Sequence, residues 1–198
     1  MKLYGTTTSP FVRRVRVVAA EIGEPIELID TAPDAGQAQL RAASPIWKVP
    51  VADLGGGRVL FDSRVIIDWL TTTRGWGPLS PPHDRWRDAN LMNAIDGALD
   101  SAIQVFYLRR DNAPVDTIAT ATKNLQRAGA ILDWLATQLT SGGTTFGHGL
   151  GLAEISLVCA LDWMDFRQSY PTANHAALGP LRAAWRERPS LAQTRPHT

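Results

Sequence analysis

Apolar and polar positions at the start of the chain follow first a strand period and then a helical one. Leu3 and Tyr4 predict a short strand, and from Pro10 onward apolar residues recur at steps of three and four, as on one face of a helix. Ser9 suits the N-cap of this helix, Pro10 its first turn and Gly23 its end. The pattern therefore predicts a strand and an amphipathic helix, with Ser9 at the positive end of that helix.

The next fifty residues continue this alternation of short strands and helices. Residues 26–30 read as a second strand, and a helical crossover between two short strands favours a parallel βαβ unit. Residues 34–43 favour a short helix, while residues 49–54 and 58–61 favour a β-hairpin around three glycines. Because helical spacing resumes after Asp62, the first part of the chain predicts the order βαβ, short helix, ββα.

The remainder of the chain predicts helices alone. Residues 74–84 are rich in Gly and Pro, as in a linker, and apolar stripes with helical spacing follow them. We therefore expect a small α/β domain over residues 1–76, a linker over 77–84 and an all-helical domain over 85–198. The four stripes comprise Leu91, Ile95, Leu99, Ala102 and Phe106; Ile118, Leu125, Leu132, Leu135 and Leu139; Leu152, Ile155, Leu157, Val158 and Leu161; and Leu178, Leu181 and Trp185.

Composition and charge exclude several classes of protein. The chain has 198 residues, of which 44% are apolar, and its 20 basic and 19 acidic side chains give a net charge of +1. This balance lacks the basic excess of a nucleic-acid-binding protein. No run approaches the ~20 apolar residues of a membrane span, and the start lacks the apolar core of a signal peptide. We therefore expect a cytoplasmic protein that binds neither nucleic acid nor membrane.

The residue types that most often bind metals are sparse. Cys159 is the only cysteine of the sequence, which excludes an intramolecular disulfide and a zinc site built on cysteine pairs; we expect it to be a small buried side chain. The four histidines are scattered, so we expect no metal site. Arg13, Arg14 and Arg16 lie off the apolar face of the first helix, where we expect a solvated arginine face.

Three short motifs of the first part of the chain resemble those of one family. "SPF" opens the first helix, "KVPV" enters the third strand and "DS" opens the last helix of the α/β half. In this order they resemble the glutathione S-transferases, and "TSPFVRRVR", "KVPV", "FDS", "DGALD" and "LDWMDFR" look most like the small bacterial YibF-type members. The resemblance covers essentially the whole chain. It implies a thioredoxin-like N-terminal domain that binds glutathione, a helical domain with a pocket for an electrophile, and a homodimer that serves detoxification.

Glutathione carries a thiol, and the resemblance assigns this thiol to the start of the first helix, at Ser9 and Phe11. A helix N-terminus favours anions and lowers thiol pKa values, and the Ser9 hydroxyl can donate a hydrogen bond to the sulfur. Lowering a thiol pKa by about two units needs roughly 2.7 kcal/mol, which one charge-assisted hydrogen bond and the helix end can supply. Two alternatives remain: Ser9 is only a helix cap, or Thr7, where some classes place their active serine, activates the thiol.

The remaining two motifs match the peptide backbone and the γ-glutamyl end of glutathione. The resemblance implies that Pro50 is cis, which exposes the backbone of Val49 for pairing with the cysteinyl residue; the alternative is a trans proline at a strand edge. Lys48 reaches the glycyl carboxylate or is solvated. Asp62 offers an acceptor for the ammonium group, and Ser63 offers an N–H and a hydroxyl for the carboxylate. Alternatively, these two residues only cap a helix.

The chain also departs from the family pattern. Trp47 replaces a usual glycine at the rim of the site, which puts the local loop geometry in doubt. Gly151 and Glu154 stand where many members carry a Ser/Thr-x-x-Asp capping box. Because glycine gives no side-chain acceptor, we expect a slightly less firm helix start there.

In the helical half, Phe106, Tyr107 and Arg110 are candidates for the electrophile pocket, with core packing and solvated surface as the alternatives. Asp96 and Asp100 share one helix face, and the resemblance implies that this helix lies at the dimer interface. One of these aspartates is expected to reach the amine of the partner's glutathione or the arginine cluster.

We consider four kinds of function. The leading one is a serine-type glutathione transferase, which adds the glutathione thiolate to a small apolar electrophile. Disulfide exchange is disfavoured because it needs a cysteine where Ser9 stands, and a serine hydrolase is disfavoured because Gly-x-Ser-x-Gly is missing. The alternative to an enzyme is a glutathione-binding, ligand-binding or protein-interaction module on the same fold, which the substitution at Trp47 keeps open.

Overall fold

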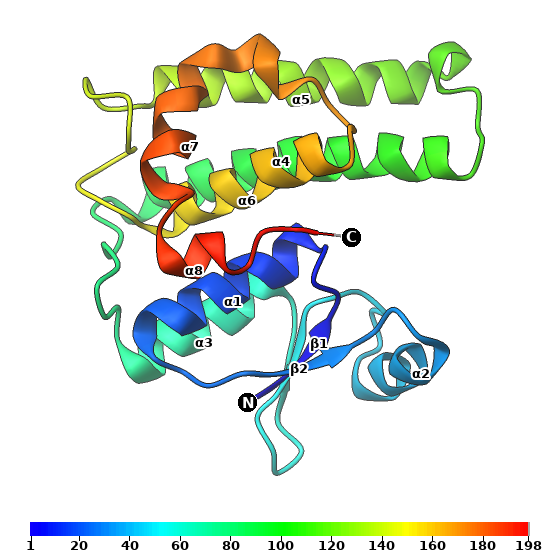
Figure 1. The fold of residues 1–198 in the computed structure, drawn as a ribbon, viewed down its shortest axis with the longest axis vertical. Coiled ribbons are helices and arrows are strands. Elements are labelled where there is room, and N and C mark those ends of the chain that lie inside the picture. The colour runs from blue at the N-terminus through cyan, green and yellow to red at the C-terminus, as the bar shows by residue number, and fades with distance from the viewer. Residues whose placement is uncertain (198) are drawn as a thin grey trace. The chain divides into compact units, whose positions relative to one another are not determined.

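The computed structural model describes residues 1–197 and divides into two compact units. The first unit comprises Met1–Ser80 together with residues 188–197, and the second comprises Pro81–Glu187. The last segment joins the first unit because the short helix α8 (Pro189–Ala192) packs on α1 (Pro10–Ile22), as Figure 1 shows. The sequence pattern had placed this segment with the helical domain.

A four-stranded mixed sheet organises the first unit, in the order β2-β1-β3-β4. Strand β1 (Lys2–Gly5) pairs parallel with β2 (Glu27–Asp30) on one side and antiparallel with β3 (Val51–Asp53) on the other. Strand β4 (Val59–Leu60) completes the hairpin. The predicted order of strands and helices is confirmed, although the hairpin strands are shorter than their apolar runs.

Three helices accompany this sheet: α1, α2 (Asp34–Ala43) and α3 (Ser63–Arg74). Helices α1 and α3 pack side by side, and α2 lies apart from them (Figure 1). Gly5 is required at the end of β1, because a Cβ there would lie only 2.4 Å from a methyl group of Val12. This close approach seats the first turn of α1 directly on the end of the central strand. The core of the unit includes Leu3, Val12, Val15, Val18, Leu40, Val51, Ile66 and Leu70.

The start and end of α1 follow the predicted signals. The Oγ of Ser9 accepts a hydrogen bond from the backbone N–H of Val12 (3.3 Å), and Gly23 takes the left-handed conformation with φ of 74°. The arginines on the same helix behave differently from expectation. Arg13 and Arg14 are only 1% and 2% exposed, so the prediction of a solvated arginine face is wrong for both. They are buried because α8 and α3 cover this side of the helix and supply oxygen acceptors.

The second unit is helical and is built on α4 (Arg85–Arg110), α5 (Ala119–Thr137), α6 (Leu152–Phe166) and α7 (Gly179–Trp185). The 3₁₀ turns η1 (Val115–Thr117) and η2 (Thr172–Leu178) connect them. The predicted stripes supply its core, since Leu91, Ile95, Leu99, Leu132, Ile155 and Leu181 are among the fully buried side chains. Cys159 on α6 is buried, as predicted. Across residues 1–197, each helix is too short or too polar to cross a membrane.

The start of α6 is held by Glu154 in place of a capping side chain. One carboxylate oxygen of Glu154 accepts from the backbone N–H of Gly151 (2.9 Å). The other accepts from the N–H of Phe146 and the hydroxyl of Thr145, both at 2.7 Å. Glu154 is 4% exposed, so these bonds are shielded from water. The glycine cap lacks a side-chain acceptor, as the sequence indicates, but the buried carboxylate of Glu154 supplies the acceptors at this helix start.

Candidate functional site

The strand register places the first two predicted segments at the same end of the sheet. Strand β3 runs antiparallel to β1, and Val51 pairs with Tyr4 near the carboxyl end of β1. Pro50 precedes Val51, and the chain leaves β1 toward Ser9 at this same end. The loop that caps α1 and the segment that enters β3 are therefore neighbours.

The third predicted segment returns to that end through β4. Leu60 pairs with Ala52, so the chain that continues from β4 runs toward the beginning of β3 and reaches Asp62 there. Helices α1 and α3 both begin at this edge, and each presents free N–H groups and a partial positive charge. The three segments singled out from the sequence thus converge at one end of the sheet, where two helices begin.

Ser9 and Thr7 share the loop between β1 and α1, and both are half-buried. Because the Ser9 oxygen accepts the N–H of Val12, its own hydroxyl hydrogen can donate to another group. The neighbouring hydroxyls of Thr6 and Thr8 lie 3.4 Å apart. The fold therefore keeps both candidates for thiol activation in one loop, with Ser9 at the helix end itself.

The Val49–Pro50 peptide bond is cis, as the resemblance implied. Val49 is half-buried, while Lys48 is exposed. Trp47 is 62% exposed, and its backbone adopts φ of 50°, a left-handed conformation that glycine adopts more readily. The guanidinium of Arg41 lies 5.0 Å from the Trp47 ring centroid. The rim of the site therefore carries an exposed indole and two basic side chains.

Asp62 and Ser63 open α3 in different ways. The carboxylate of Asp62 is exposed and accepts the backbone N–H of Arg64 (2.9 Å), so Asp62 is the N-cap. Ser63 is 1% exposed, and its Oγ accepts two hydrogen bonds from Arg14, from Nε (3.1 Å) and Nη2 (2.7 Å). The guanidinium of Arg14 also lies 4.9 Å from the ring centroid of half-buried Phe11. Nothing in the sequence indicated that Arg14 would contact Ser63.

The candidates for the electrophile pocket lie near the end of α4. The Phe106 ring packs edge-on against Trp163 of α6 with centroids 5.5 Å apart, and the guanidinium of Arg167 lies 5.3 Å from the Phe106 centroid. Tyr107 and Arg110 are exposed and stack on each other at 4.7 Å. Phe106 therefore belongs to an aromatic cluster between α4 and α6, whereas Tyr107 and Arg110 lie on the solvent-exposed surface beside it.

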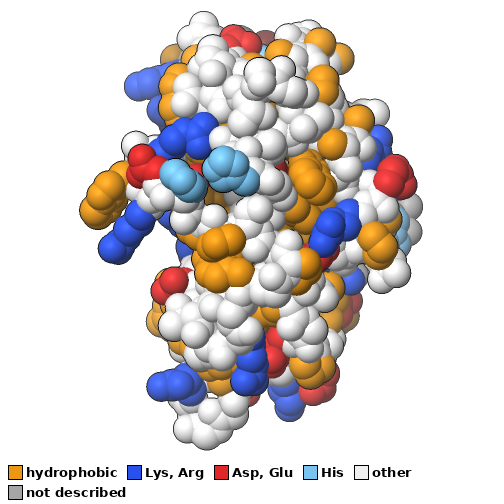
Figure 2. Space-filling view, turned by 90° about the vertical axis from the view of Figure 1, so that its left-hand side faces the viewer, with side chains coloured by type: hydrophobic (Ala, Val, Ile, Leu, Met, Phe, Trp, Pro, Cys, Tyr) orange, Lys and Arg blue, Asp and Glu red, His pale blue; other side chains and the backbone are white. Residues whose placement is uncertain are grey.

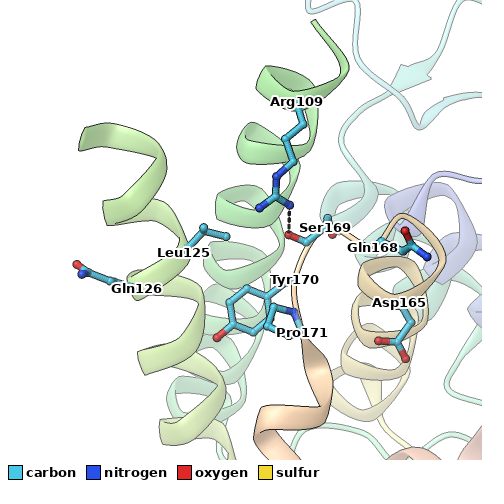
Figure 3. Close-up of a pocket in the computed structure, with 8 residues that line it drawn as sticks. All are labelled: Arg109, Leu125, Gln126, Asp165, Gln168, Ser169, Tyr170 and Pro171. Carbon is cyan, nitrogen blue, oxygen red and sulfur yellow. Dashed lines mark hydrogen bonds between the residues drawn. The ribbon is translucent and has the colours of Figure 1, made fainter. Parts of the chain in front are cut away.

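A cavity of about 870 Å³ opens elsewhere in the second unit, between α4, α5 and the segment after α6 (Figure 3). Arg109 points toward this segment and donates to the carbonyl of Ser169 (3.1 Å). The Tyr170 hydroxyl lies 2.9 Å from Nε2 of His175, whose Nδ1 lies 2.8 Å from Asp133. Burial and the charge of Asp133 raise the pKa of Tyr170. The lining residues are Arg109, Leu125, Gln126, Asp165, Gln168, Ser169, Tyr170 and Pro171, which do not include the three candidates above.

Titratable and metal-binding side chains are dispersed over the molecule. Basic and acidic side chains are interspersed on the face shown in Figure 2. His83 and His148 pack edge to face with ring centroids 5.3 Å apart. Within residues 1–197, however, the structure contains no group of three or more His, Cys, Asp or Glu residues placed to hold a metal ion.

Two family models match most of the chain. The model of the glutathione S-transferase N-terminal domain matches residues 3–78, and that of the C-terminal domain matches residues 109–193. The chain belongs to the glutathione S-transferase family. Residues 3–78 of the first unit are accordingly the thioredoxin-like domain of this family, and the helical-domain model extends from the second unit to residue 193 and so includes α8; the predicted fold is confirmed.

Bacterial members of the glutathione S-transferase family resemble this chain over nearly its full length. The uncharacterized GST-like protein YibF of Escherichia coli K12 is 28% identical over 86% of this chain and 85% of its own. A Methylobacterium radiotolerans enzyme crystallised with glutathione sulfonate has a TM-score of 0.87 at 26% identity, covering 100% of this chain and 95% of its own. A Pseudomonas fluorescens Pf-5 member with bound glutathione has a TM-score of 0.82 at 31% identity, covering 100% and 99%.

Proposed function

We propose that this protein is a serine-type glutathione transferase in which Ser9 activates the thiol. The observation that carries the proposal is the convergence of Ser9, the cis Val49–Pro50 segment and the Asp62–Ser63 cap at one edge of the sheet. The Methylobacterium relative binds glutathione sulfonate and the Pseudomonas relative binds glutathione. Both structures support glutathione as the ligand of this protein.

The residues at this edge suit the separate parts of glutathione. The backbone of Val49 pairs with the cysteinyl residue, while Ser63 and the N-terminus of α3 bind the γ-glutamyl carboxylate. Asp62 accepts the ammonium group, Lys48 binds the glycyl carboxylate, and Phe11 packs beside the ligand. The exposed carboxylate of Asp62 retains acceptor capacity beyond the single bond from Arg64 that caps the helix.

In the reaction, the thiol loses its proton to solvent, and the hydroxyl of Ser9 and the end of α1 stabilise the resulting thiolate. The sulfur lone pair then attacks an electron-poor carbon of the electrophile. A carbon–sulfur bond forms, and the bond to the leaving group breaks with its electron pair. Ser9 acts by holding negative charge on sulfur before the attack, so its effect is greatest near neutral pH.

The electrophile is proposed to be small and apolar, and to contact the surface of the helical unit near Phe106, Tyr107 and Arg110. The aromatic ring of Phe106 and the stacked pair beside it offer an apolar wall edged by one cation. Detoxification of such compounds in the cytoplasm is the physiological role expected from the sequence.

A homodimer is part of the proposal. Asp96 is half-buried and Asp100 is exposed on the same helix, α4, where the family resemblance implied the dimer interface. Sedimentation should therefore give about twice the chain mass of 21.6 kDa. A monomer at micromolar concentration would remove any role for these aspartates in the partner's site.

Initial rates with glutathione and an aryl chloride test the proposed enzyme. Ser9→Ala should lower the rate near neutral pH by about 10–100-fold and shift the pH at which the rate rises upward, because the bound thiol's pKa increases. Glutathione affinity should fall less, since Val49, Asp62 and Ser63 still hold the peptide. Thr7→Ala is the matched control from the same loop and should leave the profile unchanged.

Other outcomes of this experiment decide between the candidates. If Ser9→Ala keeps the full rate and an unshifted profile while Thr7→Ala loses both, Thr7 activates the thiol and Ser9 is a cap. A second candidate function, a glutathione-binding module without turnover, is favoured by the exposed Trp47 that replaces the usual glycine at the rim. Binding of glutathione with no product from a panel of electrophiles would support it.

A further inference from the structure

Arg14 commits two of its N–H donors to a single hydroxyl oxygen. Its Nε and Nη2 atoms lie 3.1 and 2.7 Å from the Oγ of Ser63, and both residues are almost completely buried. A serine hydroxyl has two acceptor lone pairs and one donor hydrogen. Because the guanidinium occupies both lone pairs, the hydroxyl hydrogen of Ser63 must point away from Arg14.

This arrangement makes Ser63 a hydrogen-bond donor of fixed direction. A hydroxyl that accepts from a cation is a stronger donor, and its best acceptor is an anion such as a carboxylate. Ser63 is also the first residue of α3, where the backbone dipoles favour negative charge. The group that this hydroxyl recognises is therefore an anionic acceptor at the start of α3.

We propose that Arg14 is a positioning residue for substrate binding, which orients the Ser63 hydroxyl toward the γ-glutamyl carboxylate of glutathione. The proposal rests on the proposed function, because it takes glutathione as the ligand of this edge. Arg14 itself remains behind Ser63 and need not touch the ligand. Arg14 links α1, which begins after Ser9, to α3, which begins at Ser63.

The guanidinium carries the two adjacent donors, Nε and Nη2, that this contact uses. Its planar fork presents Nε and Nη2 in parallel, whereas a lysine ammonium is a single point that cannot hold the same paired geometry. The ring of Phe11, 4.9 Å from the guanidinium carbon, lies against the face of the fork and limits its rotation. Arg14→Lys should therefore keep the positive charge and lose the positioning.

Two ligands distinguish a loss of Ser63 orientation from a general distortion of the binding site. One is glutathione, and the other is the analogue in which the α-carboxylate of the γ-glutamyl residue is replaced by hydrogen. Titration calorimetry should show that Arg14→Met and Arg14→Lys each weaken glutathione binding about tenfold and leave the Kd of the analogue within about twofold. Ser63→Ala should do the same. The double variant Arg14→Met/Ser63→Ala should bind glutathione no more weakly than Ser63→Ala alone, because both changes remove the same hydrogen bond.

Arg13→Met is the matched control, since Arg13 is equally buried on the same helix but donates to Leu191 and Thr194. It should leave the ratio of the two dissociation constants at the wild-type value. Equal weakening of both ligands by Arg14→Met, or additive losses in the double variant, would overturn the positioning role while glutathione binding by the wild type stands. A wild type that binds no glutathione overturns the proposed function and this inference together.

A crystal structure of the wild-type complex covers the case in which the Arg14 variants do not fold. The Ser63 oxygen should lie within hydrogen-bonding distance of a γ-glutamyl carboxylate oxygen and keep both contacts from Arg14. A ligand carboxylate bound without Ser63, or a Ser63 side chain turned away from Arg14, contradicts the inference.

Discussion

Arg13 donates a hydrogen bond from Nη2 to the carbonyl oxygen of Leu191, a residue 178 positions later in the chain (3.0 Å). Its Nε contacts the hydroxyl of Thr194 at 3.4 Å. Farther along the same helix, Glu21 accepts both Nε and Nη2 of Arg188, at 2.6 and 2.7 Å. Charged side chains of α1 thus fasten residues 188–197 to the thioredoxin-like domain.

Replacing Arg13 with methionine should loosen this segment. The change leaves the Leu191 carbonyl without its charged donor, so the free energy of unfolding should fall by about 1–3 kcal/mol. Hydrogen exchange should accelerate in residues 188–197 more than in the sheet. Arg16→Met, at a half-buried position of the same helix, should cost less than about 0.5 kcal/mol. Equal effects of the two variants would show that Arg13 has no special role.

The pair of Glu21 and Arg188 should make stability depend on acid pH. The hydrogen bond from Arg188 lowers the pKa of Glu21, against an opposing effect of burial, and Ser190 adds a second donor. A lowered folded-state pKa contributes stability above the unfolded value of about 4.3, and this contribution is lost as the pH falls through the folded pKa.

Urea unfolding at pH 7 and pH 3 measures this contribution. The wild type should lose about 1 kcal/mol more than Glu21→Gln between the two pH values, because only the wild type has the titrating group. Glu187→Gln, which removes an exposed carboxylate, should match the wild type. Parallel losses in the wild type and Glu21→Gln would contradict the assignment.

Glu154→Ala should be one of the most destabilising single changes in the helical domain. It removes the acceptor of three donors, those of Gly151, Phe146 and Thr145, at a position 4% exposed, and the expected loss is about 2–4 kcal/mol. Asp88→Ala is the matched control.

In α4, Asp88 likewise accepts the backbone N–H of the N-cap, Asp84 (3.2 Å), but it stands four residues beyond the cap rather than three, and this hydrogen bond is exposed to solvent. Its loss should cost about 0.5–1 kcal/mol. Chemical denaturation of both variants gives the comparison. A cost for Glu154→Ala no larger than that for Asp88→Ala would mean that burial adds nothing to this cap.

Trp47 should report glutathione binding by fluorescence. It is exposed at the rim of the proposed site, one residue before Lys48, so a bound anion beside the indole should change its emission. Trp47→Phe should remove most of the change that glutathione causes in the wild type.

Trp86→Phe should retain the change seen in the wild type. Trp86 is 72% exposed and has the Arg85 guanidinium at 5.1 Å, so it matches Trp47 in exposure and in its cationic neighbour. A response that survives in Trp47→Phe but disappears in Trp86→Phe would place the ligand in the helical domain.

Local signals in the sequence were sufficient to predict the order of the strands and helices. Ser9, Pro10 and Gly23 bound α1 through interactions with neighbours a few residues away, and the strand order brings the three motifs to one edge. The burial of Arg13 and Arg14 could not be predicted from such local signals. Their acceptors lie on α8 and α3, so the periodicity of α1 alone suggested solvent on that side.

The role of Glu154 was missed for a different reason. The first residue of the capping motif is a glycine without an acceptor, whereas the buried carboxylate three residues later accepts from backbone N–H groups of the loop before the helix. The positive φ of Trp47 does not follow from a tryptophan, and only the glycine that the family usually carries at this position pointed to it. The identity of the electrophile depends on surface shape in the helical domain, which hydrophobic periodicity does not encode.

The discontinuous make-up of the thioredoxin-like domain has a consequence for protein synthesis. A ribosome produces Met1–Ser80 first, then the whole of Pro81–Glu187, and only afterwards the segment that carries Arg188 and Leu191. During translation, Arg13 and Glu21 therefore cannot form their hydrogen bonds with Leu191 and Arg188 until more than a hundred residues after Ser80 have been synthesised. The unit that is first to leave the ribosome is therefore the last to be completed, and until then Arg13 and Glu21 of its α1 lack the contacts that the late segment provides.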